Sequence, residues 1–179
     1  MGEPKQLLPY QGRPLLRHAA ETALAAGCSP VVVVLGAHSG AVGESLAGLE
    51  VVTTVNGDWD LGMGSSIQAG LRALQDTEAH SAILALGDQP FVTAEFYRSL
   101  IAEAESSGCG IVSARYSDTV GVPAYFARRN WPLLEALAPD QGCKGVILRN
   151  EVDAKFLDCP EAAMDIDTPE EYRRLVGQP

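Results

Sequence analysis

Residues 31–36 read Val-Val-Val-Val-Leu-Gly, a run of β-branched and apolar residues that ends at a glycine. A strand with one solvated face would alternate apolar with polar residues, so this uninterrupted run is typical of a parallel strand buried on both faces. Before it, residues 13–27 carry apolar side chains at helical spacing, with Pro14 in the first turn and Gly27 as a stop signal. The pattern therefore predicts a helix followed by a buried strand.

The alternation of strand and helix patterns continues along the chain. Further strands are expected at residues 51–55, 83–86, 111–115, 122–126 and 154–157, and helices at residues 66–74, 93–106, 130–138 and 144–149. A last helix is expected after Thr168, with Pro169 at its first position and Glu171 completing a capping box. The fold class is therefore α/β, an open, mainly parallel sheet with helices on both faces, expected as a single domain over residues 1–179.

Composition limits the classes of partner. The 179 residues are 46% hydrophobic and 20% charged, as in packed globules, and the formal net charge of -10 repels polyanions. No basic patch is visible, and the apolar runs are far shorter than the roughly 18 residues of a membrane span, so neither nucleic acid nor membrane is an expected partner. The four cysteines have no Cys-x-x-Cys spacing, which predicts reduced thiols and a cytoplasmic protein.

Carboxylates stand where a metal-bound triphosphate would be held. Asp88 follows the strand at residues 83–86, and ligands of open α/β sheets bind beyond the carboxyl ends of the strands. Asp165 and Asp167 occupy alternate positions and so face the same side of an extended segment. One or two carboxylates with substrate oxygens complete a Mg²⁺ site. The alternative for each aspartate is an ordinary turn residue.

A glycine-rich loop connects a strand to a helix at residues 56–66, which read Asn-Gly-Asp-Trp-Asp-Leu-Gly-Met-Gly-Ser-Ser. Its glycines allow a ligand to approach the backbone, and free N–H groups at the helix start, together with Ser65 and Ser66, suit a nucleobase, ribose or phosphate. The alternative is a plain connection, with Trp59 and Met63 as core anchors under the loop.

Two lysines are candidate phosphate contacts. Lys5 lies in a turn-rich segment and could pair with a triphosphate oxygen and with the charge that builds on leaving pyrophosphate. Lys144 follows the loop at residues 140–143. The tight segment 121–123 is expected to approach the same place. The alternative for a lone lysine is a solvated surface group.

Taken in series, segments 2–9, 56–66, 87–91, 121–123, 140–142 and 165–170 resemble those of the MobA-like NTP transferases, in particular the molybdenum cofactor cytidylyltransferase type. The resemblance implies a Rossmann-like sheet of the nucleotide-diphospho-sugar transferase type. It also implies Mg²⁺-dependent transfer of CMP from CTP to a phosphorylated acceptor such as molybdopterin cofactor, with release of pyrophosphate. A molybdoenzyme or a maturation protein would be a further partner.

The resemblance also implies roles for individual residues. Lys5 and Asp88 would be catalytic, and Asp88, Asp165 and Asp167 would hold Mg²⁺. The nucleotide would contact Lys5, Asn56, Gly62, Met63, Gly64, Ser65 and Ser66. The acceptor would contact Gly121, Pro123, Asp140, Gly142 and Lys144.

Two departures from the family pattern leave other functions open. Family members begin with a strand and a Leu-Ala-Ala-Gly-x-Ser-x-Arg-Met-Gly loop, of which this sequence carries the final Met-Gly, and Pro139 stands where the family usually carries glycine. A first strand is therefore expected to be missing. The alternative functions are a non-catalytic module that binds nucleotide or cofactor, and a sugar-phosphate nucleotidyltransferase on the same fold.

Overall fold

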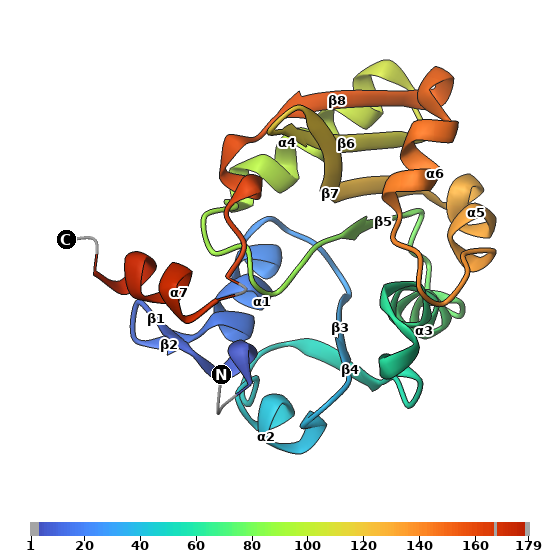
Figure 1. The fold of residues 1–179 in the computed structure, drawn as a ribbon. Helices are drawn as coiled ribbons and strands as arrows, with labels where there is room; N and C mark the ends of the chain where they lie inside the picture. The colour runs from blue at the N-terminus through green and yellow to red at the C-terminus, as the bar shows by residue number, and fades with distance from the viewer. Residues whose placement is uncertain (1–3, 167, 178–179) are drawn as a thin grey trace.

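The computed structural model describes residues 4–166 and 168–177 (Figure 1). Its strands are β1 (Pro9–Tyr10), β2 (Arg13–Pro14), β3 (Val31–Leu35), β4 (Val51–Val55), β5 (Ser81–Leu84), β6 (Ile111–Tyr116), β7 (Thr119–Ala127) and β8 (Ala154–Asp158). Its helices are α1 (Leu15–Ala25), α2 (Ser39–Glu44), α3 (Met63–Leu74), α4 (Ala94–Ser107), α5 (Trp131–Glu135), α6 (Lys144–Arg149) and α7 (Pro169–Val176). Short 3-10 turns are η1 (Lys5–Leu7), η2 (Trp59–Leu61), η3 (Arg128–Asn130), η4 (Glu151–Asp153) and η5 (Pro160–Ala163).

The main strands form two separate groups. β3 and β4 pair in parallel, and β5, β7, β6 and β8 form a four-stranded sheet in that order. β6 and β8 are parallel, whereas β7 runs antiparallel to β5 and β6. Ser117 and Asp118 join β6 to β7 with positive φ angles of 46° and 59°, and a turn this short permits only an antiparallel hairpin. The predicted α/β fold with a mainly parallel sheet is thus confirmed, with one antiparallel strand that the sequence pattern did not reveal.

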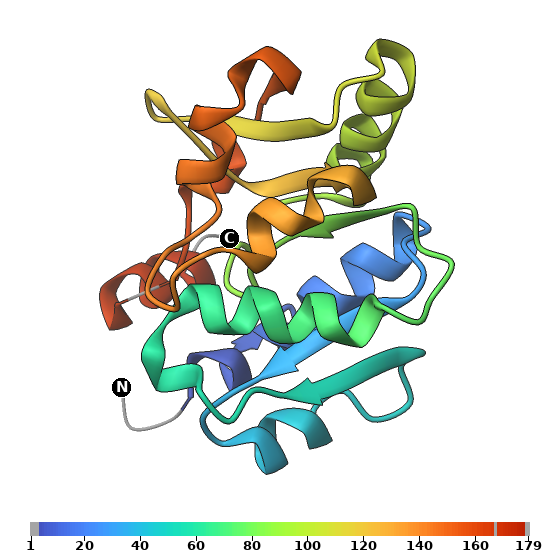
Figure 2. The same cartoon turned by 90° about the vertical axis from the view of Figure 1, so that its right-hand side faces the viewer.

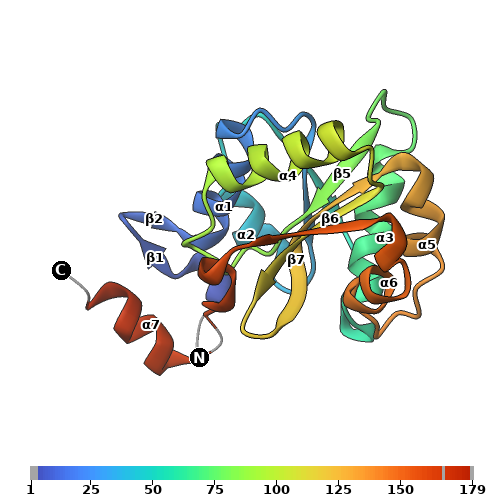
Figure 3. The ribbon, with the colours of Figure 1, turned by 90° about the horizontal axis from the view of Figure 1, so that it is seen from above.

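Helices cover both faces of the four-stranded sheet, which explains its continuous apolar strands. Ile111 packs in a buried cluster with Trp131 and Leu134 of α5, while its neighbour Val112 packs in another cluster with Leu100 of α4. Figure 3 shows α4 on one side of β6 and β7, and α5 and α6 on the other. Successive strand residues point to opposite faces of the sheet, so the residues on both faces must be apolar.

The helix ends follow the predicted signals. Thr93 caps α4 by accepting a hydrogen bond from the Phe96 N–H at 3.3 Å, and Thr168 and Glu171 form the predicted capping box of α7. The expected bounds shift where other contacts compete. α1 begins at Leu15 rather than at residue 13, since residues 13 and 14 form the short hairpin of β1 and β2.

The Asp153 carboxylate links three segments at the edge of the sheet by hydrogen bonds. Its Oδ1 accepts hydrogen bonds from the Gly110 N–H at 2.8 Å and the Arg129 guanidinium at 3.1 Å, and its Oδ2 accepts one from the Asn130 amide at 3.2 Å. Burial acts to raise the pKa of Asp153, but these donors outweigh it and lower the pKa below its ordinary value. The ionised carboxylate therefore stabilises the fold.

The pH dependence of stability tests this link. The pKa of Asp153 is lower in the folded chain, so its contribution is complete above its unfolded pKa of about 4 and is lost as the pH falls through the folded value. The side chain is 42% exposed, so we expect at most about 1 kcal/mol. Urea unfolding between pH 7 and pH 3 should show a steeper loss of stability in the parent than in Asp153→Asn. Parallel curves would contradict this role.

Neither long apolar helices nor cross-linked cysteines are found in the described chain. No described helix has the length and apolarity that crossing a bilayer requires. The thiols of Cys28, Cys109, Cys143 and Cys159 are free. Burial raises the pKa of Cys143 and of Cys159 to about 11, so both thiols stay protonated near neutral pH.

Candidate active site

A cavity of about 1030 Å³ opens between the two groups of strands. Its lining includes all of β3 and β5 and the residues that follow them, among them Gly36 and Asp88. The candidate residues Lys5, Met63, Ser66, Gly121, Gly142 and Lys144 also line it. The fold thus gathers residues from six distant segments at one cavity, which includes the carboxyl ends of β3 and β5.

Lys5 and Asp88 form an ion pair in this cavity. The Lys5 ammonium donates to Asp88 Oδ2 at 2.6 Å, and the two side chains are 30% and 15% exposed. The other carboxylate oxygen, Asp88 Oδ1, is buried and accepts no hydrogen bond from any described residue. A buried carboxylate oxygen without a donor is costly, and a bound cation would satisfy it.

The carboxyl-terminal segment returns to the same place. The Ile166 N–H donates to the Asp88 carbonyl oxygen at 3.2 Å, which puts the Asp165–Ile166 backbone beside Asp88. The Asp165 side chain is exposed. Asp167, the other predicted metal ligand of this segment, lies outside the described residues. No three acidic, cysteine or histidine side chains of the described chain cluster as a metal site. Mg²⁺ in proteins usually takes part of its coordination from substrate oxygens.

The start of α3 differs from our expectation of free N–H groups. The Gly64 and Ser65 N–H groups donate to the Pro139 carbonyl oxygen at 2.8 and 3.3 Å. The single hydrogen of the Ser65 hydroxyl has two acceptors in reach, the carbonyl oxygens of Asp58 at 2.8 Å and Gly62 at 2.7 Å, and the hydroxyl oxygen accepts from the buried Asn56 amide at 2.8 Å. These N–H groups are engaged because the loop at residues 138–142 packs directly on α3. Asn56 and Ser65, which were predicted to contact the nucleotide, are thus hydrogen-bonded within the protein instead.

Other members of this loop face the cavity. Met63 and Ser66 line it, as does Trp59, which lies against Gly36. The expectation that Trp59 and Met63 could be core anchors is wrong, since both are 49% exposed. Gly62 adopts a φ of 121° that side chains rarely accept, and a Cβ there would meet Asp140 Cα at 2.8 Å. The glycine thus permits close loop packing rather than ligand approach.

The predicted acceptor residues are divided between the cavity and other places. Gly121, Gly142 and Lys144 line the cavity, whereas Pro123 is fully buried in the core and Asp140 is exposed outside the lining. Tyr116 was not predicted, yet it lines the cavity, and its hydroxyl lies against Gly121. No spacing signal marks Tyr116, since only the β6–β7 hairpin brings it here.

Burial raises the pKa of Tyr116, and the negative charge of Asp165 raises it further. The phenol therefore stays protonated at neutral pH and can donate a hydrogen bond to an anionic ligand. This places a neutral donor among the charged side chains of the cavity.

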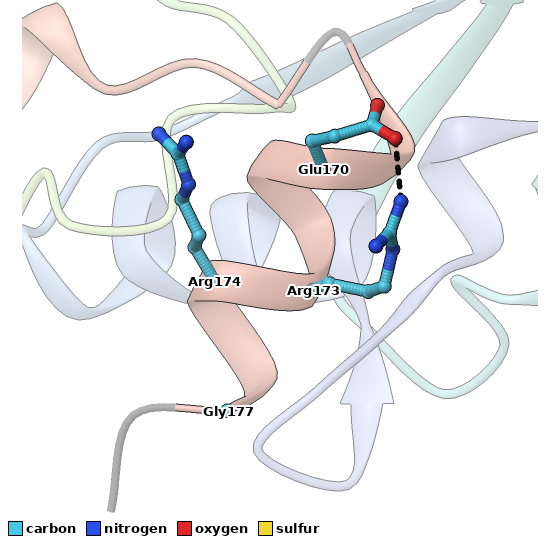
Figure 4. Close-up of a pocket in the computed structure, with 4 residues that line it drawn as sticks. All are labelled: Glu170, Arg173, Arg174 and Gly177. Carbon is cyan, nitrogen blue, oxygen red and sulfur yellow. Dashed lines mark hydrogen bonds and ion pairs between the residues drawn. The ribbon is translucent and has the colours of Figure 1, made fainter.

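A second hollow, of about 540 Å³, lies on the terminal helix α7 (Figure 4). It is lined by Glu170, Arg173, Arg174 and Gly177, and Arg173 donates to Glu170 at 2.5 Å. None of these residues lines the larger cavity. The hollow is therefore separate from the Lys5–Asp88 site.

Sequence comparisons relate the chain to known proteins. Residues 1–154 match the family model of the MobA-like NTP transferase domain. The nicotine blue oxidoreductase of Paenarthrobacter nicotinovorans is 35% identical over 188 residues, which cover 97% of this chain and 88% of that protein. The bifunctional protein GlmU of Ralstonia nicotianae is 28% identical over 90% of this chain, but the match spans only 35% of GlmU.

A solved structure has the same fold. The crystal structure of Rv0371C from Mycobacterium tuberculosis H37Rv, in complex with manganese, superposes with a TM-score of 0.78 at 30% identity. The match covers 97% of this chain and 91% of that one.

Proposed function

Because this chain belongs to the family of MobA-like NTP transferases, we propose that it transfers CMP from CTP to a molybdopterin-type cofactor, with Mg²⁺, and releases pyrophosphate. The observation that carries the proposal is the Lys5–Asp88 pair, a cation and a carboxylate joined at 2.6 Å in the lining of a large cavity. A nucleotidyltransferase needs both charges at one point, to hold the triphosphate and its counterion.

The reaction requires little acid–base chemistry from the chain. A phosphate oxygen of the acceptor forms a bond to the α-phosphorus of the nucleotide, and the bond from that phosphorus to the bridging oxygen of the β-phosphate breaks. Pyrophosphate leaves with that electron pair. An acceptor phosphate is already anionic near neutral pH, since its second pKa is about 6, so no general base is needed. Positioning and charge neutralisation remain as the tasks of the protein.

Lys5 and Lys144 supply positive charge on the cavity lining. The Lys5 ammonium, held by Asp88, would neutralise charge on the triphosphate and on the departing pyrophosphate. Lys144, together with Gly121 and Gly142, would receive the phosphorylated acceptor, and the Tyr116 hydroxyl would donate to it.

Asp88 Oδ1, which is buried without a described donor, fits a divalent cation. Asp165, beside Asp88 in space, would be the second ligand, and the family resemblance adds Asp167. When bound, the cation would supply charge neutralisation to the triphosphate oxygens. The manganese complex of the related Rv0371C protein supports the use of a divalent metal.

Pyrophosphate release tests the proposal. CTP, GTP, ATP and UTP would each be supplied with and without molybdopterin, with a sugar 1-phosphate as a separate acceptor. We expect release from CTP with molybdopterin, its loss with EDTA and its recovery with excess Mg²⁺. No release from any pairing, in a folded chain that binds nucleotide by calorimetry, would overturn the proposal in favour of a binding module. Release only with the sugar phosphate would replace the acceptor.

A further inference from the structure

The two tryptophans of the chain have different surroundings. Trp131 is 3% exposed, its indole N–H donates to the Phe126 carbonyl oxygen at 3.3 Å, and the Arg128 guanidinium lies 4.9 Å from its ring centre. Trp59 is 49% exposed and lines the large cavity. Within the described residues, its side chain makes no hydrogen bond, ring contact or cation contact. Trp131 therefore belongs to the core, whereas Trp59 offers a ring surface and an N–H group to a ligand.

The turn that carries Trp59 is held on both sides by backbone hydrogen bonds. Before it, the Asn56 N–H donates to the Leu35 carbonyl oxygen at 2.8 Å, which ties the end of β4 to the end of β3. After it, the Leu61 N–H donates to the Asp58 carbonyl oxygen at 3.0 Å and closes the turn. The exposure of the indole is thus not the result of a loose segment. A ligand would meet a ring that is already in place, so little ordering would be lost on binding.

The Trp59 side chain lies against the carboxyl end of β3. A Cβ at Gly36 would lie 2.8 Å from Trp59 Cβ and 3.0 Å from Trp59 Cγ, so a side chain there would collide with it. In Figure 2 the arrows of β3 and β4 point the same way, and the turn from β4 to α3 starts at their tips. Ligands of open α/β sheets bind beyond the carboxyl ends of the strands, which is where this side chain stands.

The neighbours in the cavity indicate which part of a ligand contacts this ring. Lys5 and Asp88, proposed to hold the triphosphate, line the same cavity as Trp59. A ring site and a charge site in one cavity match the two ends of a nucleoside triphosphate. Tyr116 and Lys144, proposed to receive the acceptor, belong to β6 and α6, and α6 packs on β7. Trp59 comes from the group of β3 and β4, and this division favours the nucleobase over the acceptor.

We infer that Trp59 stacks on the base of the nucleoside triphosphate. The inference rests on the proposed use of such a nucleotide and adds a residue that the sequence patterns placed in the core. Stacking on an aromatic side chain is tolerant of base identity, because every base has a π-face. Trp59 would therefore raise the affinity for nucleotides without selecting among them, and the choice of CTP would depend on other residues.

Nucleotide binding without an acceptor tests the inference. Calorimetry with Mg²⁺ would measure the affinity of the parent, Trp59→Ala and Trp59→Phe for CTP, ATP and inorganic tripolyphosphate. We expect Trp59→Ala to weaken the binding of both nucleotides about 10- to 100-fold. Tripolyphosphate has no ring, so its affinity should stay as in the parent, which a general loss of structure would not allow. Trp59→Phe retains an aromatic face and should recover most of the nucleotide affinity.

Tryptophan fluorescence gives a second readout, because the other tryptophan is buried. After correction for nucleotide absorption, CTP should quench the emission of the parent. The emission of Trp59→Phe comes from Trp131 alone and should not be quenched. Tripolyphosphate should leave the emission of both proteins unchanged. Equal quenching of the parent and Trp59→Phe by CTP would contradict stacking on Trp59.

Leu61→Ala is the matched control. Leu61 lies in the same turn and is 53% exposed, but it does not line the cavity, so this variant should bind CTP like the parent. Unchanged affinity of Trp59→Ala for CTP would overturn the inference, as would an equal loss for tripolyphosphate. A loss confined to molybdopterin would also overturn it and assign the ring to the acceptor.

The inference and the proposed function can fail separately. Nucleotide binding that depends on Trp59, with no release of pyrophosphate from any pairing, would support the stacking role and contradict the transferase. Pyrophosphate release from CTP with the same KM in the parent and in Trp59→Ala would support the transferase and contradict the stacking role.

Discussion

Replacing Asp88 with asparagine is expected to lower the kcat of pyrophosphate release at least about 100-fold while leaving the chain folded. Asparagine has nearly the same shape, but it removes the negative charge that pairs with Lys5 at 2.6 Å and that would hold a divalent cation through Oδ1. The Lys5 side chain is 30% exposed, so its ammonium can turn toward water, and the cost in stability should stay near 1 kcal/mol. Steady-state kinetics with urea unfolding would separate the two effects.

An ion pair elsewhere in the chain provides the matched control. Arg115 donates to Asp158 at 2.7 Å on the exposed surface, so Asp158→Asn removes a contact of similar length away from the cavity and should leave kcat unchanged. Lys5→Gln should also lower kcat. If Lys5 and Asp88 act as a unit, the double variant will lose little more than either single variant. Full activity of Asp88→Asn would contradict a catalytic role of the Lys5–Asp88 pair, on which the proposed function rests.

Much of the fold follows from local patterns in the sequence. The apolar run at residues 31–35 forms β3 with the predicted bounds, and the capping signals at Thr93 and Thr168 mark the starts of α4 and α7. β5 ends at Leu84 rather than at the predicted residue 86. The apolar pattern does extend to residue 86, but a strand also needs a hydrogen-bonded neighbouring strand. That neighbour comes from a segment remote in the sequence, so the local pattern does not reveal where the pairing ends.

The candidate site was only partly predictable, for a related reason. Lys5 and Asp88 could each be singled out by position, but 83 residues separate them, and no spacing rule predicts their ion pair. Tyr116 carries no motif and reaches the cavity only through a hairpin. The glycines of residues 62–64 suggested an open anion site, because sequence alone does not reveal that the carbonyl of Pro139 would occupy it.

That contact between α3 and the loop at residues 138–142 leads to the second large expected effect. Gly64→Ala should destabilise the chain by about 1–3 kcal/mol and lower pyrophosphate release. A Cβ at Gly64 would collide with the Ala138 carbonyl oxygen and lie 2.9 Å from that of Gln141. These are backbone atoms, so no side-chain rotation relieves the overlap. The loop would be pushed from α3, and it carries Gly142 and leads to Lys144, which line the cavity.

Helix propensity favours alanine over glycine and so opposes the expected loss of stability in Gly64→Ala. Whether this variant is less or more stable than the parent depends on which effect is larger. Alanine is favoured over glycine inside a helix by up to about 1 kcal/mol, which is smaller than the expected cost of the collision. Gly40→Ala in α2 isolates the propensity term, because a Cβ there meets no atom within 4 Å, and this variant should be neutral or more stable than the parent. Urea unfolding of both variants measures the difference. If Gly64→Ala were also more stable than the parent, the loop would not be held against α3, and the hydrogen bond from the Gly64 N–H to Pro139 would not contribute to stability.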